Sequence, residues 1–261
     1  MPDKVTAPEV RAMKNGGRRV VCVTAYDAVT GALVDEAGVD IALVGDSVGN
    51  VVLGYSSTIP VSLDEMARHT AAAARGVRRA LLVADMPFGS YQSSPAQAVE
   101  SAVTLVKAGA EAVKIEGAYC EAAGAILRAG IPVMGHVGMT PQSVHAFGGH
   151  RVQGKGESGK AVLRDAQALD EVGVFAIVLE LVPRRLAAEI TECVGAVTIG
   201  IGAGPDCDGQ VQVFHDIMGL SERPYRHSKV FTNGRESFLT GLRAFAEEVR
   251  EGAFPGEEHS F

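Results

Sequence analysis

The chain has 261 residues, of which 47% are hydrophobic, enough for one large α/β domain or two small ones. Its formal net charge of −7 argues against a nucleic-acid-binding surface, which needs a basic patch. No apolar run approaches the about 20 residues of a membrane helix, and residues 1–4 lack the apolar stretch of a signal peptide. The four cysteines show neither a C-x-x-C pair nor zinc-ligand spacing, so we expect reduced thiols in a cytoplasmic protein without membrane or nucleic-acid partners.

Short apolar runs and helical patterns alternate along the chain. The apolar runs predict eight strands, over residues 19–23, 41–44, 80–84, 112–116, 131–135, 175–179, 197–201 and 211–215. The helical patterns cover residues 5–13, 29–37, 63–75, 95–107, 119–128, 160–172, 183–193 and 237–250. About eight such units predict an α/β fold, a closed (β/α)₈ TIM barrel, as one domain over residues 1–261 with a short N-terminal extension and a C-terminal helix. The long irregular stretch 138–157 is typical of a lid or binding loop.

Carboxylates follow three consecutive predicted strands, at the end where barrel enzymes carry their chemistry. Asp46 and Ser47 follow the second strand, Asp85 follows the third, and Glu116 ends the fourth. Because consecutive barrel strands are neighbours, the three carboxylates can face one point. Hard oxygen ligands of this kind suit Mg²⁺. The alternative is that Asp46 and Asp85 cap loops or helix N-termini.

The fourth, fifth and sixth predicted strands also carry groups that can bind a ligand or move a proton. Lys114 and Glu116 are two residues apart and so share one face, either as an anion-binding pair or as a buried structural ion pair. Glu180 closes an apolar run, where burial would raise the pKa of the carboxyl and suit it to act as a base. Pairing of Glu180 with Arg184 is the alternative. His136 is either a substrate contact or a core histidine.

Two other sequence features give less specific indications of function. The segment Gly200-Ile201-Gly202-Ala203-Gly204 lacks the G-x-G-x-x-G spacing of a dinucleotide site, so close approach of a ligand to the backbone is the better interpretation. His215 and Asp216, which follow the predicted eighth strand, are interpreted as structural.

Seven short segments carry a family resemblance. They are Thr24-Ala25-Tyr26-Asp27, Val44-Gly45-Asp46-Ser47, Ala84-Asp85-Met86-Pro87-Phe88, Val113-Lys114-Ile115-Glu116-Gly117, Gly135-His136-Val137-Gly138-Met139-Thr140-Pro141-Gln142, Gly200-Ile201-Gly202-Ala203-Gly204 and Pro255-Gly256-Glu257-Glu258-His259-Ser260-Phe261. In this order they resemble the ketopantoate hydroxymethyltransferase family, a (β/α)₈-barrel family of the phosphoenolpyruvate/pyruvate superfamily. The similarity runs from about Thr24 to the end of the chain.

The resemblance implies roles for particular residues. The ligands of Mg²⁺ would be Asp46, Asp85 and Glu116. The residues that bind the 2-oxo acid would be Asp46, Ser47, Asp85 and Lys114, with His136 nearby. The proton acceptor would be Glu180. The resemblance also implies a homo-oligomer, a decamer built from two pentameric rings.

The implied reaction belongs to pantothenate biosynthesis. A hydroxymethyl group would pass from the co-substrate 5,10-methylenetetrahydrofolate to 3-methyl-2-oxobutanoate, giving 2-dehydropantoate through an enolate. The alternative is a Mg²⁺-dependent 2-oxo acid lyase or aldolase of the same superfamily, which rejection of folate and cleavage of a C–C bond would favour. A Schiff-base aldolase built on Lys114 and a non-enzymatic ligand-binding barrel remain as further alternatives.

Overall fold

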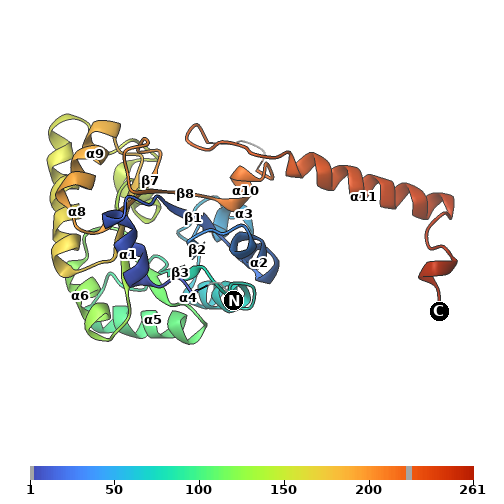
Figure 1. Cartoon of the computed structure of the whole chain (residues 1–261), viewed down its shortest axis with the longest axis horizontal. Helices are drawn as coiled ribbons and strands as arrows, with labels where there is room; N and C mark the ends of the chain where they lie inside the picture. The colour runs from blue at the N-terminus through green and yellow to red at the C-terminus, as the bar shows by residue number, and fades with distance from the viewer. Residues whose placement is uncertain (1–2, 222–224) are drawn as a thin grey trace. The chain divides into compact units, whose positions relative to one another are not determined.

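The computed structural model describes residues 3–221 and 225–261, and the chain divides into two compact units. The first unit covers Met1–Val213 and the second covers Phe214–Phe261. The first unit contains a complete barrel, and Figure 1 labels several of its strands and helices. The predicted extent of one domain over residues 1–261 stays a prediction.

Eight parallel strands close into a barrel in chain order, which confirms the predicted fold. The strands are β1 (Val20–Thr24), β2 (Ile41–Val44), β3 (Leu81–Asp85), β4 (Ala112–Lys114), β5 (Val133–Gly138), β6 (Ala176–Glu180), β7 (Val197–Ile201) and β8 (Gly209–Gln212). The closing pair is β1 with β8, where Val20 lies opposite Gly209. No side chain larger than hydrogen fits at Gly209, because a Cβ there would overlap the backbone of Val20.

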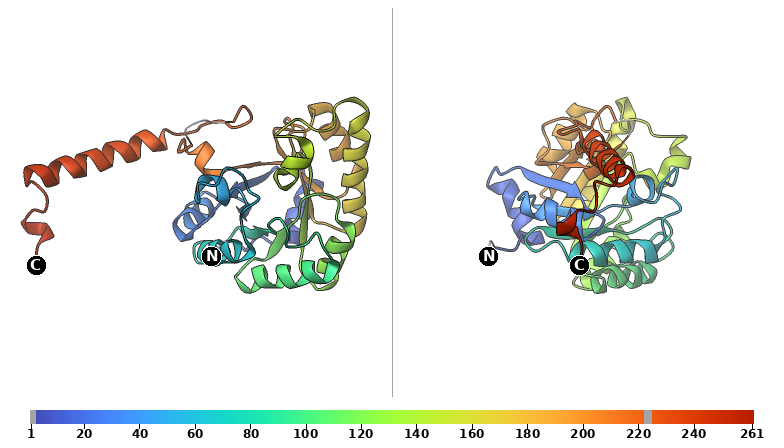
Figure 2. Two further views of the ribbon diagram at one scale, coloured as in Figure 1. Left: turned by 180° about the vertical axis from the view of Figure 1, so that it is seen from behind. Right: turned by 90° about the vertical axis from the view of Figure 1, so that its right-hand side faces the viewer.

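Helices follow most of the strands and lie outside them, as the views in Figures 1 and 2 show. The α-helices of the first unit are α1 (Ala7–Asn15), α2 (Ala28–Glu36), α3 (Val48–Val51), α4 (Leu63–Ala74), α5 (Pro95–Lys107), α6 (Cys120–Arg128), α7 (Val144–Phe147), α8 (Gly159–Val172) and α9 (Arg184–Cys193). The predicted start of α4 is confirmed, because Ser62 and Glu65 form a capping box. Ser94 likewise accepts a hydrogen bond from a backbone N–H of α5, whose first residue is a proline.

Several predicted boundaries were wrong. β4 ends at Lys114 rather than at residue 116, so Glu116 lies just past the strand, whereas Asp85 is the last residue of β3 rather than the residue after it. β5 is Val133–Gly138 rather than residues 131–135.

The eighth strand is Gly209–Gln212 rather than residues 211–215, since Gly209 and Gln210 already pair with β7 and β1. The stretch 138–157 is not wholly irregular, because it contains the single-turn 3₁₀-helix η1 (Pro141–Ser143), the short helix α7 and the start of η2 (Gly156–Ser158). Gly138 itself still belongs to β5.

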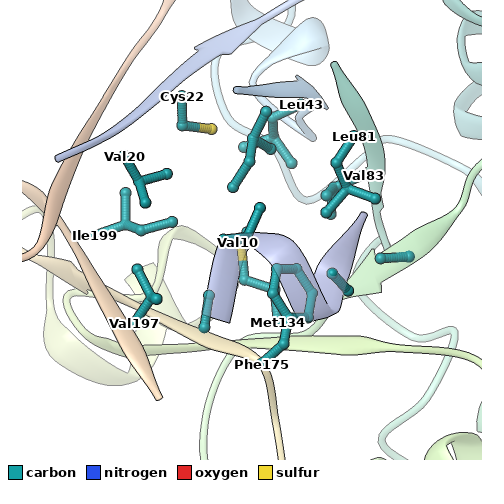
Figure 3. Packing of buried hydrophobic residues seen from close by; sticks show 14 of the residues in the cluster. Val10, Val20, Cys22, Leu43, Leu81, Val83, Met134, Phe175, Val197 and Ile199 are labelled. Carbon is teal, nitrogen blue, oxygen red and sulfur yellow. The ribbon is translucent and has the colours of Figure 1, made fainter. Parts of the chain in front are cut away.

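The core of the barrel is apolar at the end where the strands begin. The helix α1 buries Ala7, Val10 and Met13 in one cluster with side chains from the first half of the strands. Figure 3 shows Val10 surrounded by residues of this cluster, among them Val20 and Val197. This packing leaves only the opposite, carboxyl end of the barrel for polar groups.

The second unit contains α10 (Phe214–Ile217), α11 (Gly234–Glu251) and η3 (Glu257–His259). His215 and Asp216 lie in α10, and the buried Asp216 carboxylate accepts a hydrogen bond from the Ser221 hydroxyl at 2.5 Å, in line with a structural role. Among the described residues, no helix combines the length and the apolar character that crossing a membrane requires.

Candidate active site

Alternation along the strands brings the predicted charged residues to the carboxyl end of the barrel interior. In β3, Leu81 and Val83 lie in the apolar cluster, and Asp85 is the next residue of the same face. In β4 the same step of two leads from the core residue Ala112 to Lys114. Each strand therefore carries apolar residues at the bottom of the barrel and a charged residue at its top.

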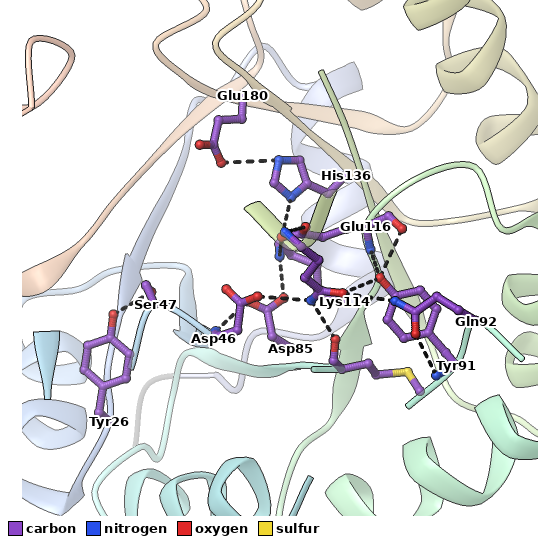
Figure 4. A network of polar contacts seen from close by, with 12 residues as sticks. Tyr26, Asp46, Ser47, Asp85, Tyr91, Gln92, Lys114, Glu116, His136 and Glu180 are labelled. Carbon is purple, nitrogen blue, oxygen red and sulfur yellow. Dashed lines mark hydrogen bonds and ion pairs between the residues drawn. The ribbon is translucent and has the colours of Figure 1, made fainter. Parts of the chain in front are cut away.

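The fifth and sixth strands repeat this arrangement. Met134 and Val178 belong to the apolar cluster, and His136 and Glu180 follow them two residues later on the same faces. His136 therefore lies within β5, whose last residue is Gly138, rather than after the strand. Figure 4 shows these side chains meeting at one end of the barrel.

Asp46 differs from these residues because it lies in the turn after β2 rather than on a strand. Its backbone N–H donates a hydrogen bond to Asp85 Oδ2 at 3.0 Å, which joins the ends of β2 and β3. Gly45 permits this close approach, since a Cβ there would lie 2.8 Å from Ser47 Oγ. Ser47 follows as the residue before α3, and its hydroxyl lies 2.8 Å from the hydroxyl of Tyr26.

Lys114 is the cation among the buried carboxylates. Its ammonium donates a hydrogen bond to Asp85 and lies 3.8 Å from Glu116 Oε1. Burial alone would lower the pKa of Lys114, but the negative charges of Asp85, Glu116 and Asp46 raise it above its usual value. The amine therefore stays protonated, which suits an anion-binding residue and argues against a Schiff-base nucleophile.

The carboxylates outnumber the cations at the centre of the site. Burial, together with the charges of Glu116 and Asp85, raises the pKa of Asp46 to about 8. Burial also acts to raise the pKa of Glu116, but the hydrogen bond and positive charge of His136 lower it below its usual value. The site therefore raises the pKa of Asp46 and lowers that of Glu116, although both carboxyls are buried.

His136 connects the buried carboxylates to Glu180. Its Nδ1 lies 3.3 Å from Glu116 Oε1 and its Nε2 lies 3.4 Å from Glu180 Oε2. Burial acts to lower the pKa of His136, but the two carboxylates outweigh this effect and raise the pKa to about 9. The raised pKa favours a positively charged imidazole, which lies at ion-pair distance from both carboxylates.

Glu180 differs from the other charged residues of the site in its accessibility. Its side chain is 17% exposed, whereas the side chains of Glu116 and His136 are each 2% exposed. Glu180 is therefore less buried than the sequence predicts, and its carboxylate remains within reach of a ligand. Its predicted alternative partner, Arg184, instead binds Asp206 through two hydrogen bonds of 2.5 and 3.2 Å.

Two residues of the site were missed at the sequence level. Gln142 is 5% exposed and donates hydrogen bonds to Glu116 from its backbone and to Asp46 from its side chain. Tyr91 is 1% exposed, and its hydroxyl accepts a hydrogen bond from the backbone N–H of Glu116. Neither follows a strand directly, so the strand-end argument could not select them. Gln142 lies within one of the segments that carry the family resemblance, and that was its only signal.

The donor set is compatible with Mg²⁺. Within residues 3–221 and 225–261, no three acidic, imidazole or thiol groups converge closely enough to hold a metal ion by themselves. Mg²⁺, however, keeps several waters and binds proteins directly through one or two carboxylates. Asp46, Asp85 and Glu116 supply buried carboxylate oxygens close together, which is the donor chemistry that Mg²⁺ prefers.

A closed parallel barrel with charged groups at the carboxyl ends of its strands defines the class of protein: a (β/α)₈-barrel enzyme. A sequence model described as ketopantoate hydroxymethyltransferase matches residues 4–257. The chain belongs to the ketopantoate hydroxymethyltransferase family.

Relatives of known name agree with this assignment. The 3-methyl-2-oxobutanoate hydroxymethyltransferase of Aeropyrum pernix is 53% identical over 260 residues, covering 98% of this chain and 94% of the relative. The protein of the same name from Moorella thermoacetica is 53% identical over 263 residues, covering 99% of this chain and 98% of the relative.

Solved structures with the same fold are more distant in sequence. A phosphonopyruvate hydrolase in complex with oxalate and Mg²⁺ superposes with a TM-score of 0.63 at 15% identity, covering 97% of this chain and 93% of that one. A 2,3-dimethylmalate lyase, described as a PEP mutase/isocitrate lyase superfamily member, gives a TM-score of 0.59 at 12% identity, covering 96% and 89%. These likenesses support the fold alone.

Proposed function

We propose that this chain transfers a hydroxymethyl group from 5,10-methylenetetrahydrofolate to 3-methyl-2-oxobutanoate, giving 2-dehydropantoate in pantothenate biosynthesis. The names of the relatives provide the activity and the acceptor. The observation that carries the proposal is the site itself, in which a partly accessible carboxylate, Glu180, stands beside a buried group of cations and carboxylates. Such a site can bind a 2-oxo acid and remove a proton next to its carbonyl.

Glu180 is proposed as the base that takes the proton from C3 of 3-methyl-2-oxobutanoate. The imidazolium of His136 lies 3.4 Å from this carboxylate and fixes its direction. Proton removal leaves an enolate, whose C3 forms a bond to the one-carbon unit of methylenetetrahydrofolate. The bonds from that carbon to the folate nitrogens break, water supplies the hydroxyl group of 2-dehydropantoate, and tetrahydrofolate leaves with its nitrogens protonated. Lys114 places a fixed positive charge where negative charge develops on the substrate, which is the kind of preorganisation that lowers a barrier.

The carboxylates have a second role in this proposal. Mg²⁺ bound at Asp46, Asp85 and Glu116 would supply a Lewis acid for the 2-oxo group. Ser47 and its partner Tyr26 lie beside Asp46 and are proposed to contact the same substrate.

The experiment that tests the proposal is formation of 2-dehydropantoate from the two substrates, with Mg²⁺ and with excess chelator. We expect product only in the presence of the metal, and none when methylenetetrahydrofolate is omitted. Formation of product at the same rate with excess chelator would support the reaction but show that it does not need the metal. Absence of product under both conditions, with cleavage of a C–C bond in another 2-oxo acid, would overturn the proposal in favour of a lyase.

A further inference from the structure

Gln142 occupies the middle of the site although it lies on no strand. It belongs to the single 3₁₀ turn η1 after β5, and it is buried. Its side-chain Nε2 lies 3.0 Å from Asp46 Oδ2 and 3.0 Å from the backbone oxygen of Met86. Its backbone N–H donates to Glu116 Oε2 at 2.9 Å. One residue thus connects the ends of β2, β3 and β4.

The amide of Gln142 can adopt only one orientation here. Both of its N–H donors are used by Asp46 and Met86, as described above. Its Oε1 accepts hydrogen bonds from the hydroxyl of Tyr91 at 2.8 Å and from Nε2 of Gln92 at 3.3 Å. A flipped amide would turn its oxygen toward a carboxylate and a carbonyl, and its N–H groups toward the amide donor of Gln92. The four hydrogen bonds therefore orient the group.

Tyr91 sets the direction of this network. Its hydroxyl accepts from the Glu116 backbone N–H at 3.0 Å. Its one proton faces two acceptors, Gln142 Oε1 at 2.8 Å and the Glu116 backbone oxygen at 3.1 Å, and Gln142 Oε1 is the nearer. Figure 4 shows Tyr91 beside Glu116 and close to Gln92. The tyrosine hydroxyl thereby connects the backbone just after β4 to the side-chain amide of Gln142, which in turn donates a hydrogen bond to Asp46.

A neutral double donor has an advantage at this position. Asp46, Asp85 and Glu116 repel one another when ionised, and hydrogen bonds to their oxygens reduce that repulsion. A lysine or arginine at position 142 would do the same but would add a positive charge that competes with a bound cation. An amide supplies the hydrogen bonds without that charge.

We propose that Gln142 is a positioning residue that holds the Asp46 and Glu116 carboxylates in the arrangement needed for Mg²⁺ and the 2-oxo acid, with Tyr91 fixing the orientation of its amide. This inference rests on the proposed function for the identity of the substrate. The part of the inference that concerns metal binding is independent of the proposed function, because metal binding can be measured without turnover.

The test compares Gln142→Met, which keeps a similar length without the donors, with Tyr91→Phe, which keeps the amide and removes the hydroxyl that orients it. Gln167→Glu on α8 is the control for an exchanged glutamine elsewhere in the barrel. The Kd for Mg²⁺ is measured by titration calorimetry on full-length protein without substrate. We expect the Kd to rise about 10–100-fold in Gln142→Met, the usual effect of losing an outer-shell partner, and by a smaller factor in Tyr91→Phe.

A second readout separates positioning from folding. Exchange of the C3 proton of 3-methyl-2-oxobutanoate in D₂O is measured at saturating Mg²⁺, and we expect it to slow in both variants. Thermal melting of the metal-free proteins reports structural damage, and Tyr91→Phe remains informative should Gln142→Met fail to fold. Wild-type Kd and wild-type exchange in the folded variants would overturn the proposal. Wild-type protein that forms 2-dehydropantoate yet binds no Mg²⁺ would also overturn it, while leaving the activity in place.

Discussion

At the scale of single residues, His136 is the point where the buried carboxylates meet the partly accessible one. It lies between Glu116 and Glu180, and both contacts raise the pKa of its imidazole. The pKa of His136 therefore depends on both neighbouring carboxylates. A change at one of them is expected to alter the orientation of the next, so substitutions that keep the shape of the side chain are the most informative.

Glu180→Gln tests the proposed base. The amide can still accept a hydrogen bond from His136 but cannot accept a proton, so we expect C3 proton exchange to slow by about 10²–10⁴-fold. Binding of 3-methyl-2-oxobutanoate should change little. NMR in D₂O measures the exchange, and Glu189→Gln on the exposed side of α9 is the matched control. Exchange in Glu180→Gln at the rate of the control would show that another group is the base.

The raised pKa values predict how pH affects the stability of the metal-free protein. The pKa of His136 is about 9 when folded and near 6.5 when unfolded, so its contribution is complete below pH 6.5 and is lost as pH rises through 9. The pKa of Asp46 is raised from 3.8 to about 8, so its ionisation also destabilises the fold as pH rises toward 8. Both groups act in the same direction.

We therefore expect the Tm in chelator to fall between pH 6 and pH 9, by about 2–4 °C for each kcal/mol lost in a chain of this size. Asp46→Asn, which cannot ionise, should show a shallower fall, and Mg²⁺ should restore stability most at high pH. Melting followed by circular dichroism at pH 6, 7, 8 and 9 makes the comparison. A wild-type Tm that rises over this range would contradict the assigned pKa shifts.

At the scale of elements, the pairing of β5 with β6 decides where Glu180 lies. Gly138 lies opposite Glu180 in this pair, and its φ of +94° is in the region that favours glycine. A Cβ at this position would overlap the Glu180 carbonyl oxygen and lie 2.6 Å from Val182 Cγ2. The glycine is therefore part of what sets the position of the proposed base.

Gly138→Ala is expected to damage activity more than stability. Backbone strain should cost about 1–3 kcal/mol, and displacement of Glu180 by about 1 Å can slow the reaction by about 10²-fold. Gly173→Ala is the matched control, because its φ is +102° and no atom lies within 4 Å of the added Cβ. Denaturant unfolding and C3 exchange are measured on both. Equal loss of exchange in the two variants would show that general strain, rather than this contact, is responsible.

At the scale of the whole molecule, the second unit carries an apolar stripe on α11. The side chains of Phe238, Leu242, Phe245 and Val249 recur every three or four residues, so they share one face, and each is between 47% and 64% exposed. Large exposed apolar patches usually mark an interface. We propose that this face contributes to a homo-oligomer, as the family resemblance implies.

Leu242→Glu should reduce the mass of the assembly in solution. The substitution puts a charge in the centre of the stripe, where burial would be costly. Thr240→Glu is the control, since position 240 lies on the opposite face of α11 and receives the same charge. Light scattering coupled to size exclusion measures both masses. An unchanged mass for Leu242→Glu would remove α11 from the interface.

Much of the fold and of the candidate site could be predicted from local patterns. Asp85, Lys114, His136 and Glu180 were selected because they lie at the ends of short apolar runs, and the carboxyl ends of barrel strands meet at one end of the barrel. The helix starts predicted at residues 63 and 95 were also correct. The eighth strand was misplaced because its pattern is short, and its extent depends on pairing with β7 and β1.

By itself, the sequence determined the alternation of strands and helices, the apolar bottom of the barrel and the charged groups at its top, because each of these depends on spacing within a few residues. Only the tertiary structure decided which of those groups touch. Gln142 and Asp46 are 96 residues apart, and their hydrogen bond depends on the path of the turn after β5 rather than on any periodicity. The partial exposure of Glu180 was likewise decided by tertiary structure, because it depends on which residues distant in sequence pack around the side chain.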